Sequence, residues 1–163
     1  MNEKEKVFSK IHSLLNGLTI TINKTDDTRP WGGFFVIEEL EAEKFINYFF
    51  PTLDKNKLLT GKLSPKILLL QPNKKLSWQY HHRRSELWKL IEGEAGIIRS
   101  DTNVEGEQQQ MIKDEIVELK KGERHRLVGQ NQWGIIAEIW IHTDVENPSN
   151  EDDIIRIQDD FGR

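Results

Sequence analysis

The sequence predicts a mostly β domain, a barrel or sandwich of short strands, preceded by a segment of helices and strands. Residues 65–142 divide into short β-rich runs at near-regular spacing, which is typical of antiparallel barrels and sandwiches. Turn signals such as Pro72-Asn73 and Lys121-Gly122 separate these runs. The length of 163 residues fits one domain. The expected strands cover residues 66–71, 76–82, 86–92, 95–100, 109–112, 115–119, 125–128 and 133–142.

The part of the chain before this β region carries helical patterns as well. Apolar residues at steps of three and four predict a helix over residues 5–18. A second helical spacing over residues 39–50 ends at Pro51, because proline cannot continue a helix. Alternating residues predict short strands over 19–22 and 33–37, on either side of a turn.

This change of pattern divides the chain into two parts. We expect residues 1–64 to form a helix-and-strand extension that packs on the barrel. We expect residues 65–163 to form the barrel itself with a C-terminal tail, which packs on its outside or at its mouth. The strand over 19–22 has a free edge that could pair with a second copy of the chain, so a homodimer is one expectation.

Composition excludes several classes of protein. The chain has 23 Lys and Arg against 27 Asp and Glu, and this net charge of −4 argues against a general nucleic-acid binder. The absence of cysteine excludes disulfides, thiolate metal sites and a cysteine nucleophile. No apolar run approaches 18 residues, and the start of the sequence lacks the apolar region of a signal peptide. We therefore expect a cytoplasmic protein without a membrane segment.

The expected strands over 76–82 and 86–92 carry polar residues among large apolar ones. Gln79 and His81 share one strand face, and Glu86 opens the next strand among large apolar residues. Buried polar groups of this kind are costly unless a partner satisfies them, and His125 follows a later turn from which a strand re-enters the barrel. Imidazole, carboxylate and amide groups suit Zn²⁺ first, and also Fe²⁺, Mn²⁺, Co²⁺ or Ni²⁺. The alternative is that the histidines are polar surface residues of a sheet.

The order of these residues resembles the two motifs of the cupin superfamily. The first motif reads Asn73-x5-Gln79-x-His81-x4-Glu86-x6-Gly93, and the second reads Gly122-x-x-His125. Asn73 and Gln79 stand where most cupins have Gly and His, and Lys120 stands at a Pro. The resemblance implies a cupin-type double-stranded β-helix, which is a jelly-roll barrel.

A narrower resemblance is to the mannose-6-phosphate isomerase domain of the type II family, in which Gln at the first ligand position is typical. The matching segments are Leu76–Trp88, Arg29–Gly32, His125–Leu127 and Glu151–Arg163. This resemblance implies metal ligands at Gln79, His81, Glu86 and His125. It departs at Phe161, where the family has Tyr, and in the extra segment 38–64. No Gly-rich nucleotide loop precedes residue 29.

Four further residues are candidates for chemistry or substrate binding. Arg84 shares a strand face with Glu86 and could clamp a phosphate or hydroxyl group, or simply pair with carboxylates. Glu138 lies in a late strand, where a carboxylate acts as a base with raised pKa or pairs structurally with an arginine. Arg156 and Arg163 are candidate phosphate ligands if the tail folds over the mouth, and otherwise belong to a solvated tail.

The resemblance implies a metal-dependent aldose–ketose isomerase. Its small-molecule partner would be a sugar phosphate, with mannose 6-phosphate and fructose 6-phosphate as substrate and product. The alternatives are a non-catalytic cupin that binds a sugar or sugar nucleotide, and another cupin reaction such as epimerisation or oxygenation. The residue types fit the first, because a metal and a positioned base are what enediol chemistry requires.

Overall fold

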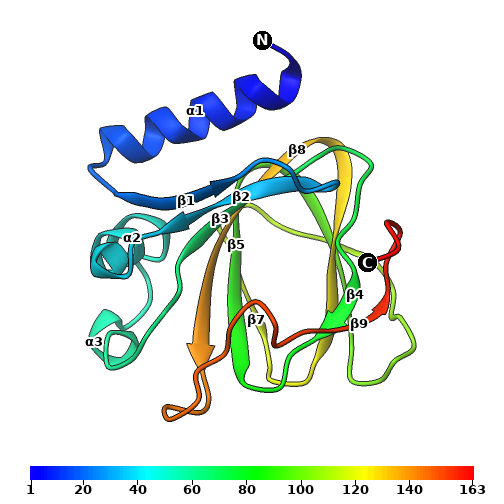
Figure 1. Ribbon diagram of the computed structural model, residues 1–163. Coiled ribbons are helices and arrows are strands. Elements are labelled where there is room, and N and C mark those ends of the chain that lie inside the picture. The colour runs from blue at the N-terminus through cyan, green and yellow to red at the C-terminus, as the bar shows by residue number, and fades with distance from the viewer.

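The computed structural model describes residues 1–163 and shows nine strands in one antiparallel sheet that curls into a barrel (Figure 1). Neighbouring strands run in the order β1-β2-β3-β8-β4-β9, and β5 pairs with β8, β7 and β6. The elements are α1 (Glu3–Gly17), β1 (Ile22–Asp26), β2 (Gly32–Ile37), η1 (Glu39–Glu41), α2 (Ala42–Phe49), α3 (Lys55–Leu58), β3 (Lys66–Leu70), β4 (Trp78–Tyr80), β5 (Arg84–Ser100), β6 (Gln109–Gln110), β7 (Ile116–Leu119), β8 (Arg124–His142) and β9 (Ile155–Gln158). No helix has the length and apolar character needed to cross a membrane.

The long strands β5 and β8 pair along almost their whole length and form much of the barrel wall. Their register runs from Arg84 opposite His142 to Ser100 opposite Arg124, with shifts on both sides of Gly93. Gly93 has a φ of 78°, and a Cβ there would lie 1.7 Å from the carbonyl oxygen of Trp133, so only glycine fits this bend. The bend explains why the expected runs 86–92 and 95–100 form one strand, as do 125–128 and 133–142.

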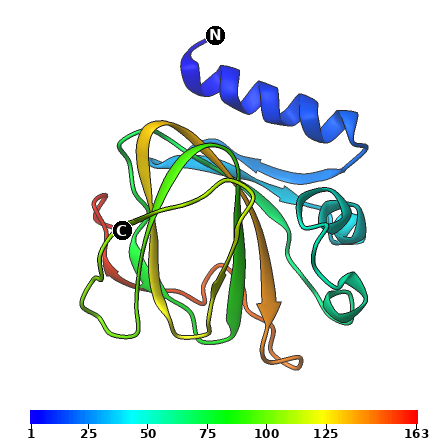
Figure 2. The same ribbon diagram turned by 180° about the vertical axis from the view of Figure 1, so that it is seen from behind.

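The N-terminal elements cover the outer face of the sheet. In Figures 1 and 2, α1 lies along β1 and β2, while α2 and α3 lie together at one side of the barrel. The ring of Phe8 in α1 packs on Phe35 in β2 with 5.4 Å between ring centroids. β2 also pairs with β3, so the sheet continues across residue 64. The division of the chain into an extension and a barrel at this residue stays a prediction.

Two apolar cores lie on the two faces of this sheet, and β3 contributes to both. Ile67 and Leu69 pack outward into the core formed with the helices, and Leu68 and Leu70 pack inward into the barrel core. All five residues of β3 are buried, which accounts for the continuous apolar run from Ile67 to Leu70.

The expected helices are confirmed, and one expected strand is misplaced. Residues 5–18 lie almost wholly in α1. Residues 39–50 form η1 and α2, and their apolar side is buried at Ala42, Phe45, Ile46, Phe49 and Phe50. The strand expected over 19–22 begins only at Ile22, because Thr19 adopts a φ of 55° in the turn that ends α1. The tail contains β9, which pairs with β4 on the side of the barrel away from α2 (Figure 1).

Candidate metal centre

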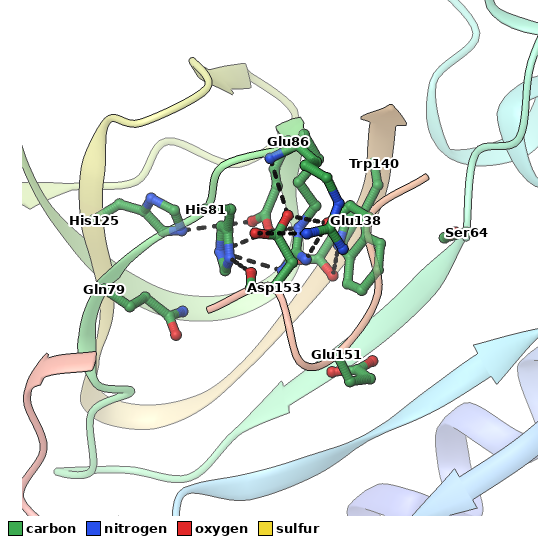
Figure 3. Close-up of polar contacts among 12 residues, drawn as sticks. Ser64, Gln79, His81, Glu86, His125, Glu138, Trp140, Glu151 and Asp153 are labelled. Carbon is green, nitrogen blue, oxygen red and sulfur yellow. Dashed lines mark hydrogen bonds and ion pairs between the residues drawn. The ribbon is translucent and has the colours of Figure 1, made fainter. Parts of the chain in front are cut away.

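Three of the four expected metal ligands converge inside the barrel. His81 follows β4, Glu86 lies in β5 and His125 lies in β8, and a ligand atom from each lies within 4.8 Å of the other two. All three side chains are at most 3% exposed. Nε2 of His81 lies 3.2 Å from Oε1 of Glu86, and Nε2 of His125 lies 3.7 Å from Oε2 (Figure 3).

Backbone carbonyl groups fix the orientation of both imidazole rings. Nδ1 of His81 lies 2.6 Å from the carbonyl oxygen of Asp153, and Nδ1 of His125 lies 2.8 Å from that of Glu123. A carbonyl oxygen only accepts, so each Nδ1 carries a hydrogen, and each Nε2 is directed toward Glu86. Metal-binding histidines are held in this way, with the second nitrogen donating to a carbonyl or carboxylate group.

The charge states of the cluster also fit a divalent metal. Burial lowers the pKa of His125 to about 4, although the neighbouring Glu86 opposes the shift. Burial would raise the pKa of Glu86, but the Arg84 guanidinium and the two histidines hold it well below its usual range. The cluster therefore offers a carboxylate and a neutral imidazole, and Nε2 of His125 is buried without a hydrogen-bond partner. That unpartnered lone pair is what a metal ion would fill.

Gln79 lies beside the cluster but bonds to a neighbour. In β4 it stands opposite His125 (Figure 3). Its side chain lines a cavity that His81 and Glu86 also line. Its Oε1 accepts a hydrogen bond of 3.0 Å from the Ser77 hydroxyl. The amide is thus in the neighbourhood expected of a fourth ligand, with one lone pair of Oε1 already engaged.

Arg84 is buried, and its donors are directed into the protein. Its Nε donates to Oε1 of Glu86 at 2.7 Å, and its Nη2 lies 3.2 Å from Nε2 of His81. The guanidinium also stacks on Trp140, 3.6 Å from the ring centroid. Arg84 therefore pairs with a carboxylate of the cluster itself, and few of its donors are free for a substrate.

Glu138 lies on β8 next to the cluster and is buried. The indole groups of Trp88 and Trp140 donate to its two oxygens at 2.7 Å and 2.9 Å. Burial, together with the charge of Glu86, raises the pKa of Glu138 to about 7. A carboxyl group with this pKa can take up and release a proton near neutral pH.

A cavity leads from this cluster to the surface, and more cations than anions line it. Arg156 and Arg163 of the tail both line it. Arg163 is ion-paired with Asp159 at 2.8 Å, whereas Arg156 forms no ion pair. The charged residues of the lining are Arg29, Lys66, Arg84, Arg156, Arg163, Glu86, Glu138 and Glu151.

Lys66 and Arg29 also line the cavity, although neither was predicted from the sequence as a site residue. Lys66 is 5% exposed, pairs with Glu151, and lies 4.2 Å from the ring centroid of Trp140 and 4.9 Å from that of Phe34. In the sequence, the feature that sets Lys66 apart is its position as the first residue of an otherwise apolar strand. Arg29 belongs to a segment that matches the family, and in the structure it pairs with Asp26 at 3.0 Å.

Phe161, where the family has a tyrosine, packs against the barrel core from the tail. It is half-buried, and the Arg163 guanidinium lies 5.7 Å from its ring centroid. Its ring is absent from the lining of the cavity. The substitution therefore lies beside the site rather than in it.

The sequence of this chain matches a known protein family. The family model described as "Mannose-6-phosphate isomerase C-terminal" matches residues 50–159. The xanthan biosynthesis protein XanB of Xanthomonas campestris pv. campestris (strain B100) is 31% identical over 135 residues, which is 83% of this chain. The chain spans only 23% of the length of XanB.

Solved structures with the same fold have little sequence in common with this chain. The capsular polysaccharide assembling protein CapF from Staphylococcus aureus matches 84% of this chain and 34% of its own, with a TM-score of 0.53 and 13% identity. Vicilin from Solanum lycopersicum matches 85% of this chain and 35% of its own, with a TM-score of 0.54 and 13% identity. The fold is the cupin-type β-barrel that the motifs imply, and the chain belongs to the family of mannose-6-phosphate isomerase C-terminal domains.

Proposed function

We propose that this domain is a metal-dependent aldose–ketose isomerase of sugar phosphates, with mannose 6-phosphate and fructose 6-phosphate as its substrate pair. The observation that carries the proposal is the unpartnered Nε2 of His125, which faces Glu86, a residue that lines a cavity with more cations than anions. The family match and the relation to XanB support the assignment to sugar chemistry.

His81, Glu86 and His125 would hold the metal, with Gln79 as the neighbouring fourth donor. These ligand types suit Zn²⁺ and also Fe²⁺, Mn²⁺, Co²⁺ and Ni²⁺. When bound, such an ion supplies positive charge that polarises a carbonyl or hydroxyl oxygen of the substrate. Both Nε2 atoms are directed toward Glu86 because the backbone carbonyls of Asp153 and Glu123 hold the two Nδ1–H groups.

Glu138 is our candidate for the proton-transfer group. Isomerisation moves a proton from C2 of the aldose to C1 and a second proton from O2 to O1, through an enediol. With a pKa of about 7, Glu138 can remove the C2 proton as a carboxylate and return it to C1 as an acid. The indole groups of Trp88 and Trp140 hold its two oxygens in place during both steps.

The charge of the cavity lining fits the phosphate group of such a substrate. Five cationic side chains line the cavity against three carboxyl groups, one of which is Glu138 with its raised pKa. Arg156 has no ionic partner, and Lys66 has only Glu151, whose side chain is 63% exposed. A phosphate at the mouth would complete the pairing of these cations.

The direct test is turnover by the metal-loaded protein. Mannose 6-phosphate should yield fructose 6-phosphate, and in D₂O deuterium should appear at C1 of the product wherever the proton on Glu138 exchanges with solvent. Glu138→Gln should abolish turnover and retain the metal. Protein that holds its metal yet converts none of the mannose, glucose and heptose phosphates would contradict the isomerase.

A second candidate is a non-catalytic cupin that binds a sugar or sugar nucleotide. One observation favours it: Arg84 already bonds to Glu86 and contacts Nε2 of His81, so the cluster is partly satisfied by the protein alone. This candidate predicts tight, saturable binding of a sugar phosphate without product. Calorimetric titration alongside the turnover assay separates the two functions.

A further inference from the structure

The segment between β8 and β9 contains two buried polar residues among exposed ones. Ser149 is 3% exposed and Asp153 is 4% exposed, whereas the three residues between them are exposed. Buried hydroxyl and carboxylate groups are retained only where they are hydrogen-bonded. Figure 3 shows Asp153 next to His81, whereas Glu151, two residues earlier, lies apart from the cluster.

Asp153 contacts three consecutive residues, His81 to Arg83, in the middle of the first motif. Its backbone carbonyl accepts the Nδ1–H of His81 at 2.6 Å. Its carboxylate accepts the backbone N–H groups of His82 and Arg83, each at 3.0 Å. The side chain thereby fixes the position of its own carbonyl group relative to the His81 ring.

Ser149 extends these contacts to Arg84. Its hydroxyl donates to Oδ2 of Asp153 at 2.5 Å and accepts from Nη1 of Arg84 at 2.9 Å. The carbonyl of Asn150 accepts from the same Nη1 at 3.1 Å. With that end of the guanidinium held, Nε of Arg84 is aimed at Oε1 of Glu86.

We propose that Ser149 and Asp153 form a clasp that positions two of the metal ligands, His81 directly and Glu86 through Arg84. The inference depends on the proposed metal centre. Neither residue is itself a ligand, because every oxygen of the Asp153 carboxylate already accepts hydrogen bonds and Ser149 is occupied on both sides. Groups that orient metal ligands in this way commonly change metal affinity 10- to 100-fold when they are removed.

The test compares Asp153→Ala with the matched control Asp152→Ala, in which the neighbouring exposed carboxylate is removed instead. Competition with a chromophoric chelator gives the dissociation constant for Zn²⁺ or Co²⁺. We expect Asp153→Ala to weaken binding by about 10- to 100-fold and Asp152→Ala to leave it within about twofold. Asp153→Asn should fall between them, because an amide oxygen accepts hydrogen bonds but the amide nitrogen does not.

A second readout needs no metal and reports on His81 alone. Long-range ¹H–¹⁵N spectra of the histidine rings should show the Nδ1–H tautomer of His81 in the unaltered protein and in Asp152→Ala. In Asp153→Ala the His81 signals should move toward the Nε2–H tautomer, since the carbonyl acceptor is no longer held. A merely structural role of Asp153 would lower thermal stability without this change.

Two outcomes would overturn the clasp: unchanged metal affinity in folded Asp153→Ala, or an unchanged His81 tautomer. If Asp153→Ala does not fold, Ser149→Ala takes its place, since it removes one hydroxyl and leaves the backbone contacts. It should weaken metal binding severalfold, and an unchanged affinity would again contradict the proposal. If the unaltered protein binds neither Zn²⁺ nor Co²⁺, the metal centre fails, and the tautomer measurement still judges whether Asp153 orients His81.

Discussion

The indole N–H of Trp88 donates to Oε2 of Glu138 at 2.7 Å, between residues that stand opposite each other on β5 and β8. Trp140 donates to the other oxygen. Burial and the charge of Glu86 raise the pKa of Glu138 to about 7, although the charges of Lys66 and Arg84 and the hydrogen bond from Trp88 oppose the rise. The same two β-strands therefore supply candidate metal ligands and a carboxyl group that titrates near neutral pH.

This raised pKa predicts a pH-dependent cost to folding in the metal-free protein. Below pH 4.5 Glu138 is protonated in both the folded and the unfolded protein. As the pH rises through 7, the folded protein must ionise this buried carboxyl group, which is already ionised in the unfolded protein. Stability is therefore lost with rising pH, by roughly 2–3 kcal/mol between pH 5 and pH 8. Glu138→Gln should remove this loss, as measured by urea unfolding at both pH values. The same difference between variant and parent at pH 5 and pH 8 would contradict it.

The ligand set makes a separate prediction about metal content. The purified protein should hold close to one transition metal per chain, and His81→Ala or His125→Ala should lose most of it, because each removes a lone pair from a site of three ligands. His82→Ala is the matched control, since its exposed ring packs edge-on against Tyr80. Elemental analysis checks this, and equal retention in all three variants would show that the ligands lie elsewhere.

The sequence predicted most strands from local alternation, and the two motifs identified three candidate ligands that the structure brings together. Alternation placed Gln79 and His81 on one face, and motif spacing added Glu86 and His125. The sequence does not show whether a glycine ends a strand at a turn or bends a strand that continues. At Gly93 the chain bends sharply, yet β5 stays paired with β8 on both sides, so two expected strands are one.

The residues that the sequence did not identify owe their position to distant partners. Asp153 lies in an acidic run of the kind that usually forms a solvated turn, and it is buried because it accepts backbone N–H groups of His82 and Arg83. Lys66 begins an apolar strand, and its charge is compensated by Glu151 and by the ring of Trp140 far along the chain. Both sets of partners lie about 70 to 85 residues away in the sequence, so neighbouring residues do not reveal them.

The outer core predicts a large loss of stability from one substitution. Phe45 is fully buried in α2, and its ring lies 4.8 Å from that of Phe49 and 6.2 Å from that of Phe50. Phe45→Ala should lower the free energy of unfolding by about 3–5 kcal/mol, because it removes buried area and leaves a cavity. Leu40→Ala, at a side chain that is 96% exposed, should change it by less than about 0.5 kcal/mol. Urea unfolding measures both, and similar losses would contradict the packing of α2 on the sheet.

The cation-lined cavity predicts how the substrate's phosphate is recognised. Lys66→Met and Arg156→Met each remove a charge from the lining while keeping an unbranched side chain, and each should raise KM for a sugar phosphate by about 10- to 100-fold with little change in kcat. The expected ratio corresponds to a charged hydrogen bond of about 1.5–3 kcal/mol. Glu151→Gln should lower KM, since it frees Lys66 from its exposed partner.

Two comparisons keep this last prediction specific to phosphate. Lys74→Met removes a positive charge from an exposed turn outside the cavity and should leave KM unchanged, which controls for the overall charge of the protein. Calorimetric titration with the sugar phosphate and with the same sugar lacking phosphate tests recognition even where there is no turnover. The Lys66 and Arg156 variants should lose affinity for the first ligand only, because the second has no charge for these side chains to bind. Equal losses for both ligands would mean that these residues shape the cavity and do not bind phosphate.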